Sequence, residues 1–247
     1  MRREQPSAER LAVRKYEAVF LDAQGTLLHA LPSVPAIYAS VFRRFSGGLT
    51  EARIAATMSE QWAEFRASVD PRTASFDTSD DITRRWWEGF NARIFRRLGM
   101  TDEADMETFL DGLWDAFGRP ENWELYPEVP EVLTELRKRG YRLGVISNWD
   151  SRLSAVCRRL GLTAYTEFIL ASASAGMDKP DRRIFEIALS RVAATPERAV
   201  HVGDDYQADV LGARNAGLDA ILIDRDGHTP RPVPTIHTLR ELLDILP

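Results

Sequence analysis

The sequence is poor in cysteine, has no long apolar run and carries no excess of basic residues. Its one cysteine, Cys157, excludes an intrachain disulfide and a zinc site built on several cysteines. The helical spacing of Cys157 with Leu153 and Leu160 predicts a buried packing residue. No apolar stretch approaches the roughly 20 residues of a membrane span. With a formal net charge of −5 and no long basic run, we expect neither nucleic acid nor a membrane as a partner.

The amino-terminal segment also lacks the apolar core of a secretory signal. It reads Met-Arg-Arg-Glu-Gln-Pro-Ser-Ala-Glu-Arg, and we expect residues 1–14 to be a loosely ordered extension of a cytoplasmic protein. The rest has an ordinary globular composition, with 44% hydrophobic and 28% charged residues among 247. A chain of that length can bury a sizeable core without disulfides or structural metal.

Short apolar runs that each end on a polar residue recur along the chain. These runs are 16–21, 142–146, 167–171, 199–203 and 220–223. Near-continuous apolar runs of this length predict strands that are buried on both faces of a parallel sheet. Segments with helical periodicity separate the later runs, at 130–139, 151–160, 181–192 and 206–216. The alternation predicts an α/β fold with an open, doubly wound parallel sheet.

The stretch from about Pro35 to Trp123 has a different pattern, with helical periodicity and no convincing buried strand. The segments 38–42, 54–65, 81–98 and 104–117 are typical of amphipathic helices. We therefore expect an all-helical block, residues 33–124, inserted after the first strand. The α/β core would then consist of residues 15–32 and 125–247.

Polar residues stand at the ends of three predicted strands, at Asp22, Ser147 and Asp204. In doubly wound sheets, ligands bind beyond the carboxyl ends of the strands. Asp and Ser also begin turns, which is enough to explain any one of these residues alone. Their recurrence at three strand ends favours a shared site.

The loop after the first strand and the residues around the later strand ends support a site for a phosphate and a cation. The segment Asp22-Ala23-Gln24-Gly25-Thr26 is a glycine-containing turn whose amides can face an anion, with the Thr26 hydroxyl placed to hold the loop. Ser147 and Asn148 are small polar groups suited to phosphoryl oxygens.

Several carboxylates are expected to converge on this site. Asp22 and Asp204, with Asp205 or Asp209 nearby, would repel one another without a cation. Hard oxygen ligands with open positions suit Mg²⁺, which commonly binds one or two carboxylates together with a substrate phosphate. Lys179 would add positive charge.

These residues together resemble the four motifs of the haloacid dehalogenase-like (HAD) hydrolase superfamily. The motifs are Asp22-Ala23-Gln24-Gly25-Thr26, Ser147-Asn148, Lys179-Pro180 and Gly203-Asp204-Asp205 with Asp209. Within the superfamily, the chain resembles the REG-2-like subgroup, that of haloacid dehalogenase-like hydrolase domain-containing protein 3. The segments that carry this closer resemblance are 146–153, 179–185, 201–204 and Arg85-Trp86-Trp87. Four motifs in this order at compatible spacing are a specific signal.

The resemblance implies a Rossmann-like core with a helical cap, and a phosphatase that acts on a small phosphorylated substrate. It implies that Asp22 is the nucleophile and that Mg²⁺ is the cofactor. The implied metal ligands are Asp22, the Gln24 carbonyl and Asp204, supported by Asp205 and Asp209. The implied phosphoryl-binding residues are Thr26 in the first loop, Ser147, Asn148 and Lys179. Lys179 would also stabilise the charge of the transferred group.

Gln24 departs from the phosphatase pattern, which has Asp at this position to protonate the leaving group and then activate water. Glutamine can do neither, and general acid–base catalysis is typically worth about 10²–10⁴-fold. Three functions therefore stay open: a weak or specialised Mg²⁺ phosphatase, a catalytically silent module that binds a phospho-ligand or partner, and a 2-haloacid dehalogenase, whose halide leaving group needs no proton. The acids Asp204 and Asp205 favour the phosphatase, since dehalogenases of this fold work without metal.

Overall fold

A computed structural model describes residues 15–45, 48–68, 70, 77–227 and 231–247, so the expected extension 1–14 lies outside the described residues. The main feature is a six-stranded parallel sheet with the order β5-β4-β1-β6-β7-β8. Its strands are β1 (Ala18–Leu21), β4 (Arg142–Ser147), β5 (Phe168–Ala171), β6 (Ala199–Gly203), β7 (Asp219–Ile223) and β8 (Thr235–Ile236). The chain runs outward from β1 to β5 and then returns to the other side of β1. This confirms the doubly wound α/β fold.

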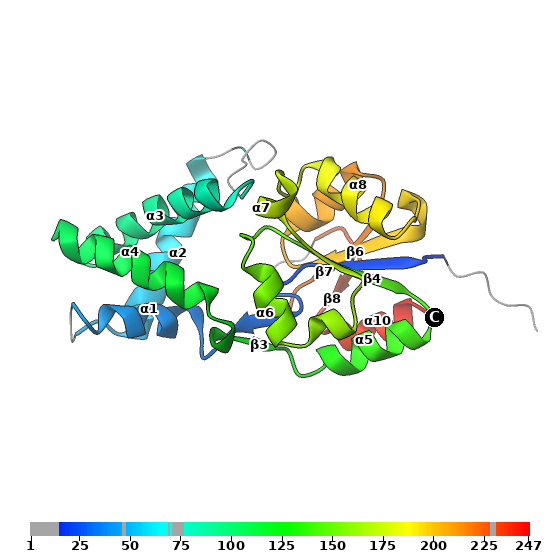
Figure 1. Ribbon diagram of the computed structural model, residues 1–247, viewed down its shortest axis with the longest axis horizontal. Coiled ribbons are helices and arrows are strands. Elements are labelled where there is room, and N and C mark those ends of the chain that lie inside the picture. The colour runs from blue at the N-terminus through cyan, green and yellow to red at the C-terminus, as the bar shows by residue number, and fades with distance from the viewer. Residues whose placement is uncertain (1–14, 46–47, 69, 71–76, 228–230) are drawn as a thin grey trace, which may run out of the picture.

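Helices cover both faces of the sheet (Figure 1). One face carries α5 (Val129–Lys138), α6 (Leu153–Arg159) and α10 (Leu242–Ile245), and the other carries α8 (Arg182–Arg191), the π-helical segment η4 (Tyr206–Leu211) and α9 (Gly212–Asn215). The central strand β1 serves both layers because its side chains alternate between the faces. Val19 and Leu21 pack with the first group, while Ala18 and Phe20 pack with the second. All four are fully buried.

The remaining short helices connect these elements. They are α7 (Ser172–Ala175) and the 3₁₀ turns η1 (Pro120–Asn122), η2 (Leu162–Ala164), η3 (Pro196–Arg198) and η5 (Leu239–Glu241). The single cysteine, Cys157, lies fully buried in α6, and burial raises the pKa of its thiol to about 12. Cys157 is therefore the packing residue that the sequence predicts.

Four longer helices form a separate layered group at the left of Figure 1. They are α1 (Val34–Phe42), α2 (Glu51–Ser68), α3 (Asp80–Arg97) and α4 (Glu103–Gly118). Ser33, Ser79 and Asp102 cap the first, third and fourth helices by accepting backbone N–H bonds. The group has its own aromatic core, in which Phe42 stacks on Phe109 with ring centroids 4.2 Å apart. In the described ranges, no helix combines the length and the apolar character needed to cross a membrane.

A small two-stranded antiparallel ribbon joins the helical group to the sheet. It pairs β2 (Leu28–Ala30) with β3 (Trp123–Leu125). The sequence pattern predicted neither of these strands, nor β8, because two or three residues are too few to show a periodicity. The predicted helix 206–216 also differs, since it is divided into η4 and α9.

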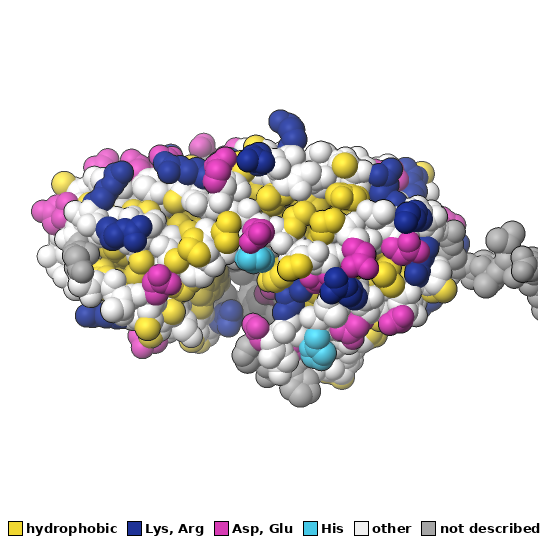
Figure 2. Space-filling view, turned by 90° about the horizontal axis from the view of Figure 1, so that it is seen from below, with side chains coloured by type: hydrophobic (Ala, Val, Ile, Leu, Met, Phe, Trp, Pro, Cys, Tyr) yellow, Lys and Arg dark blue, Asp and Glu magenta, His cyan; other side chains and the backbone are white. Residues whose placement is uncertain are grey.

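The helical group meets the sheet region across side chains from both parts. Asp80 at the start of α3 accepts hydrogen bonds from the Ser151 amide and hydroxyl, at 2.8 and 2.6 Å. The Arg152 guanidinium lies 3.7 Å from the ring centroid of Trp114 on α4. Seen from below, the molecule is hollowed between the two parts (Figure 2). The residues that follow β1 and β6 line a cavity together with Ser33 and Val34 at the start of α1.

Candidate active site

The candidate site lies where the strand order reverses, because β1 is flanked by β4 on one side and β6 on the other. Asp22 directly follows β1, Ser147 ends β4 and Asp204 directly follows β6. Adjacent parallel strands bring these three positions to one edge, as the sequence predicts. Asp22 and Ser147 are buried, whereas Asp204 is exposed to solvent.

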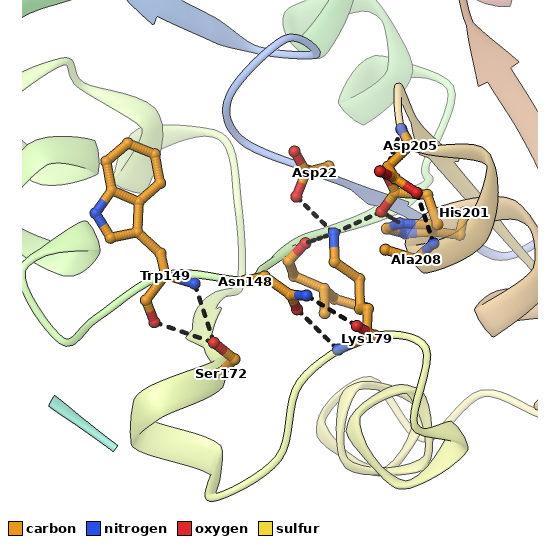
Figure 3. A network of polar contacts seen from close by, with 10 residues as sticks. Asp22, Asn148, Trp149, Ser172, Lys179, His201, Asp205 and Ala208 are labelled. Carbon is orange, nitrogen blue, oxygen red and sulfur yellow. Dashed lines mark hydrogen bonds and ion pairs between the residues drawn. The ribbon is translucent and has the colours of Figure 1, made fainter. Parts of the chain in front are cut away.

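Lys179 is the centre of a buried polar network (Figure 3). The residue is only 3% exposed to solvent. Its ammonium group donates hydrogen bonds to Asp22 Oδ1 at 2.5 Å, to Asp209 Oδ1 at 2.5 Å and to the Ile146 carbonyl at 2.9 Å. A lysine ammonium has three donors, so this arrangement uses them all. Lys179 therefore holds the Asp22 carboxylate in place, and it could contact a ligand only by giving up one of these bonds.

Asp209 anchors the same network from the π-helical segment η4. Its Oδ1 also accepts a hydrogen bond from His201 Nε2 at 2.8 Å, and its Oδ2 accepts one from the Asp205 amide at 3.0 Å. Gly203 permits this approach, because a Cβ at that position would lie 2.1 Å from Asp209 Cγ. Both carboxylate oxygens are thus engaged by protein donors.

The charges of this network shift the pKa values of its members in opposite directions. Burial disfavours the charged form of Asp209, but Lys179 and the His201 hydrogen bond outweigh it and hold the pKa of Asp209 well below its ordinary value. Burial likewise disfavours charged Lys179, yet Asp209 and Asp22 raise the pKa of its ammonium group. Burial and repulsion from Asp209 raise the pKa of Asp22, although Lys179 opposes this.

Asp204 lies at the mouth of the site against the loop that follows β1. A Cβ on Gly25, which has φ +78°, would lie 2.5 Å from the Asp204 carboxyl carbon. The packed protein around Asp204, followed by the charges of Asp22 and Asp209, raises the pKa of its carboxyl well above the ordinary value. Because Asp204 is exposed to solvent, we regard repulsion between the carboxylates as the more important cause.

Three carboxylates could hold a metal ion at this point. One oxygen from each of Asp22, Asp204 and Asp209 lies within 4.8 Å of the others. Asp205, which we expected to support the metal or to orient the loop, is not among the described residues that converge. Its Oδ1 instead accepts the amides of Gln207 and Ala208, each at 2.8 Å, and so caps η4. Its observed contacts are those of a loop-orienting residue.

The Asn148 side chain positions the segment that carries Lys179. Its Oδ1 accepts the Lys179 amide at 2.7 Å, and its Nδ2 donates to the Lys179 carbonyl at 2.8 Å (Figure 3). The side chain is therefore already paired with backbone. The neighbouring Ser147 is the last residue of β4 and lies at the same edge of the sheet as Asp22.

The expected role of the Thr26 hydroxyl is not borne out by its contacts. Thr26 is fully buried, and its Oγ1 has no hydrogen-bond partner among the described residues. The loop is held through its backbone instead. Arg225 Nε donates to the Gly25 carbonyl at 3.0 Å and Nη2 to the Thr26 carbonyl at 2.6 Å. Arg225 also pairs with buried Glu128 at 2.8 Å.

Sequence reasoning missed Arg225, Glu128 and His201 as parts of the site. Arg225 lies about 200 positions from the loop it holds, and nothing in its local sequence distinguishes it. The place of His201 within an apolar run predicts a buried core histidine. It is fully buried, but its Nε2 pairs with Asp209, and its Nδ1 has no partner within the described part of the chain. The only feature of the sequence that relates His201 to Asp209 is their short separation of eight residues.

Gln24 is exposed beside Asp204 and lines a cavity of about 450 Å³. Its backbone forms an isolated bridge with Leu28. Gln24, the position where the sequence departs from the phosphatase pattern, therefore borders this cavity.

Comparisons with known proteins cover most of the chain. A family model described as haloacid dehalogenase-like hydrolase matches residues 16–217. Haloacid dehalogenase-like hydrolase domain-containing protein 3 of Homo sapiens is 36% identical over 191 residues, which cover 74% of this chain and 76% of that protein. Phosphoserine phosphatase of Thermus thermophilus is 32% identical over 222 residues, covering 84% and 88%. A HAD-hydrolase structure from Bacillus subtilis, 21% identical, covers 94% of this chain and 99% of its own with a TM-score of 0.75, which shows a shared fold.

Proposed function

The chain belongs to the haloacid dehalogenase-like hydrolase family, and from this we propose that it is a Mg²⁺-dependent phosphatase that forms a covalent aspartyl-phosphate on Asp22. The observation that carries the proposal is the convergence of Asp22, Asp204 and Asp209 around one point, with Lys179 bonded to two of them. Relatives named as phosphatases support a small phosphorylated substrate.

The residues present fit a divalent cation. The pKa values of Asp22 and Asp204 are raised, so both would gain from a positive charge placed between them. Asp22 and Asp204 would hold the ion with the Gln24 carbonyl. Asp209 would support it from behind, because both of its oxygens already accept protein hydrogen bonds. When bound, Mg²⁺ would neutralise charge on the carboxylates and on the phosphoryl oxygens.

Asp22 is suited to attack phosphorus. Lys179 binds Oδ1 and fixes the carboxylate, so Oδ2 is the oxygen that we expect to form the bond. The bond between phosphorus and the leaving oxygen breaks in the same step, and the leaving group departs with the electron pair. Water then attacks the phosphorus of the aspartyl-phosphate, which releases phosphate and restores the Asp22 carboxylate. Two easier displacements replace one difficult displacement.

The phosphoryl group would be held by residues from β4 and from the segment before α8. Ser147 would bind an oxygen with its hydroxyl. Lys179 would add charge by exchanging one of its present bonds for a phosphoryl oxygen. Asn148 would act mainly by positioning, because its carboxamide already holds the Lys179 backbone.

The absence of an acid at Gln24 limits the substrate. An amide can donate a hydrogen bond to the departing oxygen, but it cannot transfer a proton to it or take one from water. We therefore expect slow turnover of alkyl phosphates, whose leaving alkoxide needs a proton. Substrates with a weakly basic leaving group should react faster.

We also propose that residues 33–124 are a cap and that residues 15–32 and 125–247 are the catalytic core. The helical group borders the site, and hydrogen bonds such as Asp80 to Ser151 join it to the core. A cap in this position would exclude water and complete the pocket around the substrate.

The test compares wild type with Gln24→Asp, using Gln24→Asn as the matched control that has the size of Asp without its acidity. An aryl and an alkyl phosphate are assayed with and without Mg²⁺. Gln24→Asp should raise alkyl phosphate turnover by at least about tenfold, and Gln24→Asn should not. Asp22→Asn should abolish activity in every background.

Two outcomes would favour other functions. Chloride release from 2-chloropropionate without Mg²⁺ would favour a dehalogenase. Phosphate binding without turnover of either ester, also in Gln24→Asp, would favour a silent phospho-ligand module.

A further inference from the structure

The cavity beside Gln24 is lined by aromatic residues for which the proposed reaction has no role. Gln24 and Asp204 border it on the side of the site, and its volume is about 450 Å³, within the usual range for small ligands. Its other walls include His29 and Tyr126. None of the described residues that line it is a lysine or an arginine, so its side chains offer no positive charge to a charged leaving group.

His29 and Tyr126 form an aromatic wall of this cavity. Their ring centroids lie 4.8 Å apart with an interplanar angle of 50°. They come from the paired strand β2 and the residue directly after β3, so the ribbon fixes their separation. Both residues are half-buried and line the cavity.

Arg225 holds this wall to the catalytic loop. Its guanidinium lies 3.4 Å from the Tyr126 ring centroid. The same guanidinium bonds to the carbonyls of Gly25 and Thr26 and pairs with buried Glu128. The position of the Tyr126 ring is thereby tied to the loop that carries Gln24.

We infer that this cavity is the subsite for the leaving group and that it takes a planar ring stacked on the His29–Tyr126 wall. The inference rests on the proposed function, since Gln24 marks the side on which the leaving oxygen departs. Two separate observations converge on it. The amide of Gln24 demands a weakly basic leaving group, and an aromatic or conjugated ring bearing the oxygen is weakly basic because it delocalises the charge. The wall independently offers aromatic surface to such a ring.

Binding is tested first, with Mg²⁺ present, by calorimetric titration of phenylphosphonate and methylphosphonate. Neither probe can be hydrolysed, so the measurement does not depend on turnover. Stacking of one ring should make phenylphosphonate bind about three- to tenfold more tightly. Tyr126→Leu should remove this preference, because it should weaken the binding of phenylphosphonate more than that of methylphosphonate. Tyr165→Leu, at a half-buried tyrosine that does not line this cavity, is the matched control and should keep the preference.

His29→Val is the second variant, in case Tyr126→Leu disturbs the loop. It removes half of the wall from a strand position without touching Arg225. It should reduce the preference for phenylphosphonate in the same way. Equal binding of both phosphonates by wild type would overturn the inference while leaving the phosphatase proposal intact. Binding of neither phosphonate would overturn both.

Turnover then separates ring recognition from leaving-group basicity. Phenyl phosphate has a ring and a weakly basic leaving group, acetyl phosphate has only the weakly basic leaving group, and benzyl phosphate has only the ring. Tyr126→Leu should lower kcat/KM for phenyl and benzyl phosphate by about three- to tenfold more than it lowers kcat/KM for acetyl phosphate. An equal loss for all three substrates would refute the stacking role. If wild type hydrolyses none of them, the phosphatase proposal itself fails, even where the phosphonates bind.

Discussion

Gly25→Ala should displace the Asp204 carboxylate from its place against the loop that follows β1, residues 22–26. The new Cβ would lie 2.5 Å from the Asp204 carboxyl carbon and 2.5–2.8 Å from its two oxygens, distances that nonbonded atoms do not tolerate. The short Asp204 side chain must therefore rotate away. Alanine at φ +78° also carries a strain of about 1–2 kcal/mol, which has to be separated from the displacement of the carboxylate.

Gly161→Ala provides that separation. Gly161 has φ +79°, and a Cβ there meets nothing within 4 Å among the described residues. Both variants should lose about 1–2 kcal/mol of unfolding free energy in the absence of metal. Only Gly25→Ala should also lose Mg²⁺ binding and phosphatase activity.

The size of the effect follows from linkage between binding and folding. At a Mg²⁺ concentration 100 times Kd, binding stabilises the folded state by about 2.7 kcal/mol. Loss of a group that only supports a metal ligand already weakens binding by up to about 100-fold. If displacement of the Asp204 carboxylate weakens binding by about that factor, the gain falls to about 0.4 kcal/mol. At about 2–4 °C per kcal/mol for a chain of this size, the Mg²⁺-dependent rise in Tm drops from about 5–11 °C to about 1–2 °C.

Thermal unfolding followed by circular dichroism, over a series of Mg²⁺ concentrations, measures these shifts directly. Gly161→Ala should keep the full rise from a lower starting Tm. If Gly25→Ala also kept the full Mg²⁺-dependent rise in Tm, the reasoning would be refuted. That result would show that Mg²⁺ binding does not need the Asp204 carboxylate at its present position.

Four further outcomes follow. Asp204→Asn should abolish the Mg²⁺-dependent rise in Tm. Asp205→Asn should retain that rise, because asparagine still caps η4. An equal loss of the rise in both variants would contradict this assignment. Arg225→Met leaves Glu128 buried without its partner and should cost about 3–5 kcal/mol in urea unfolding, with partial recovery when Glu128→Gln is added. Asn148→Ala should cost about 1–3 kcal/mol in stability and lower kcat more than KM in steady-state assays. Solution scattering with and without vanadate should show a more compact molecule when the ligand is bound; identical curves would argue against a moving cap.

Much of the fold could be predicted because its signals are local. The runs that became β1, β4 and β6 are mostly apolar and almost entirely buried, which is the pattern of strands covered on both faces. Three of the four helices in the helical group, α2, α3 and α4, are long enough to show the 3.6-residue period over four or more turns. The ribbon β2–β3 was missed because its strands are three residues long.

Side-chain roles were predicted less well than positions. Thr26 and Asp205 were named for their hydroxyl and carboxylate groups, but which partner such a group meets depends on the backbone around it. Thr26 points into the core without a hydrogen-bond partner among the described residues, and Asp205 turns to the amides of η4. Sequence spacing does not contain these directions.

The sequence by itself determined the succession of the main strands and helices along the chain and the residue types at the strand ends. Both depend on neighbours a few positions away. Only the tertiary structure decided that Lys179 bridges Asp22 and Asp209, and that Arg225 contacts both Tyr126 and the loop after β1. These contacts join residues up to 200 positions apart. Their geometry arises from the reversal of strand order at β1 and from close approaches at glycine, which no local pattern specifies.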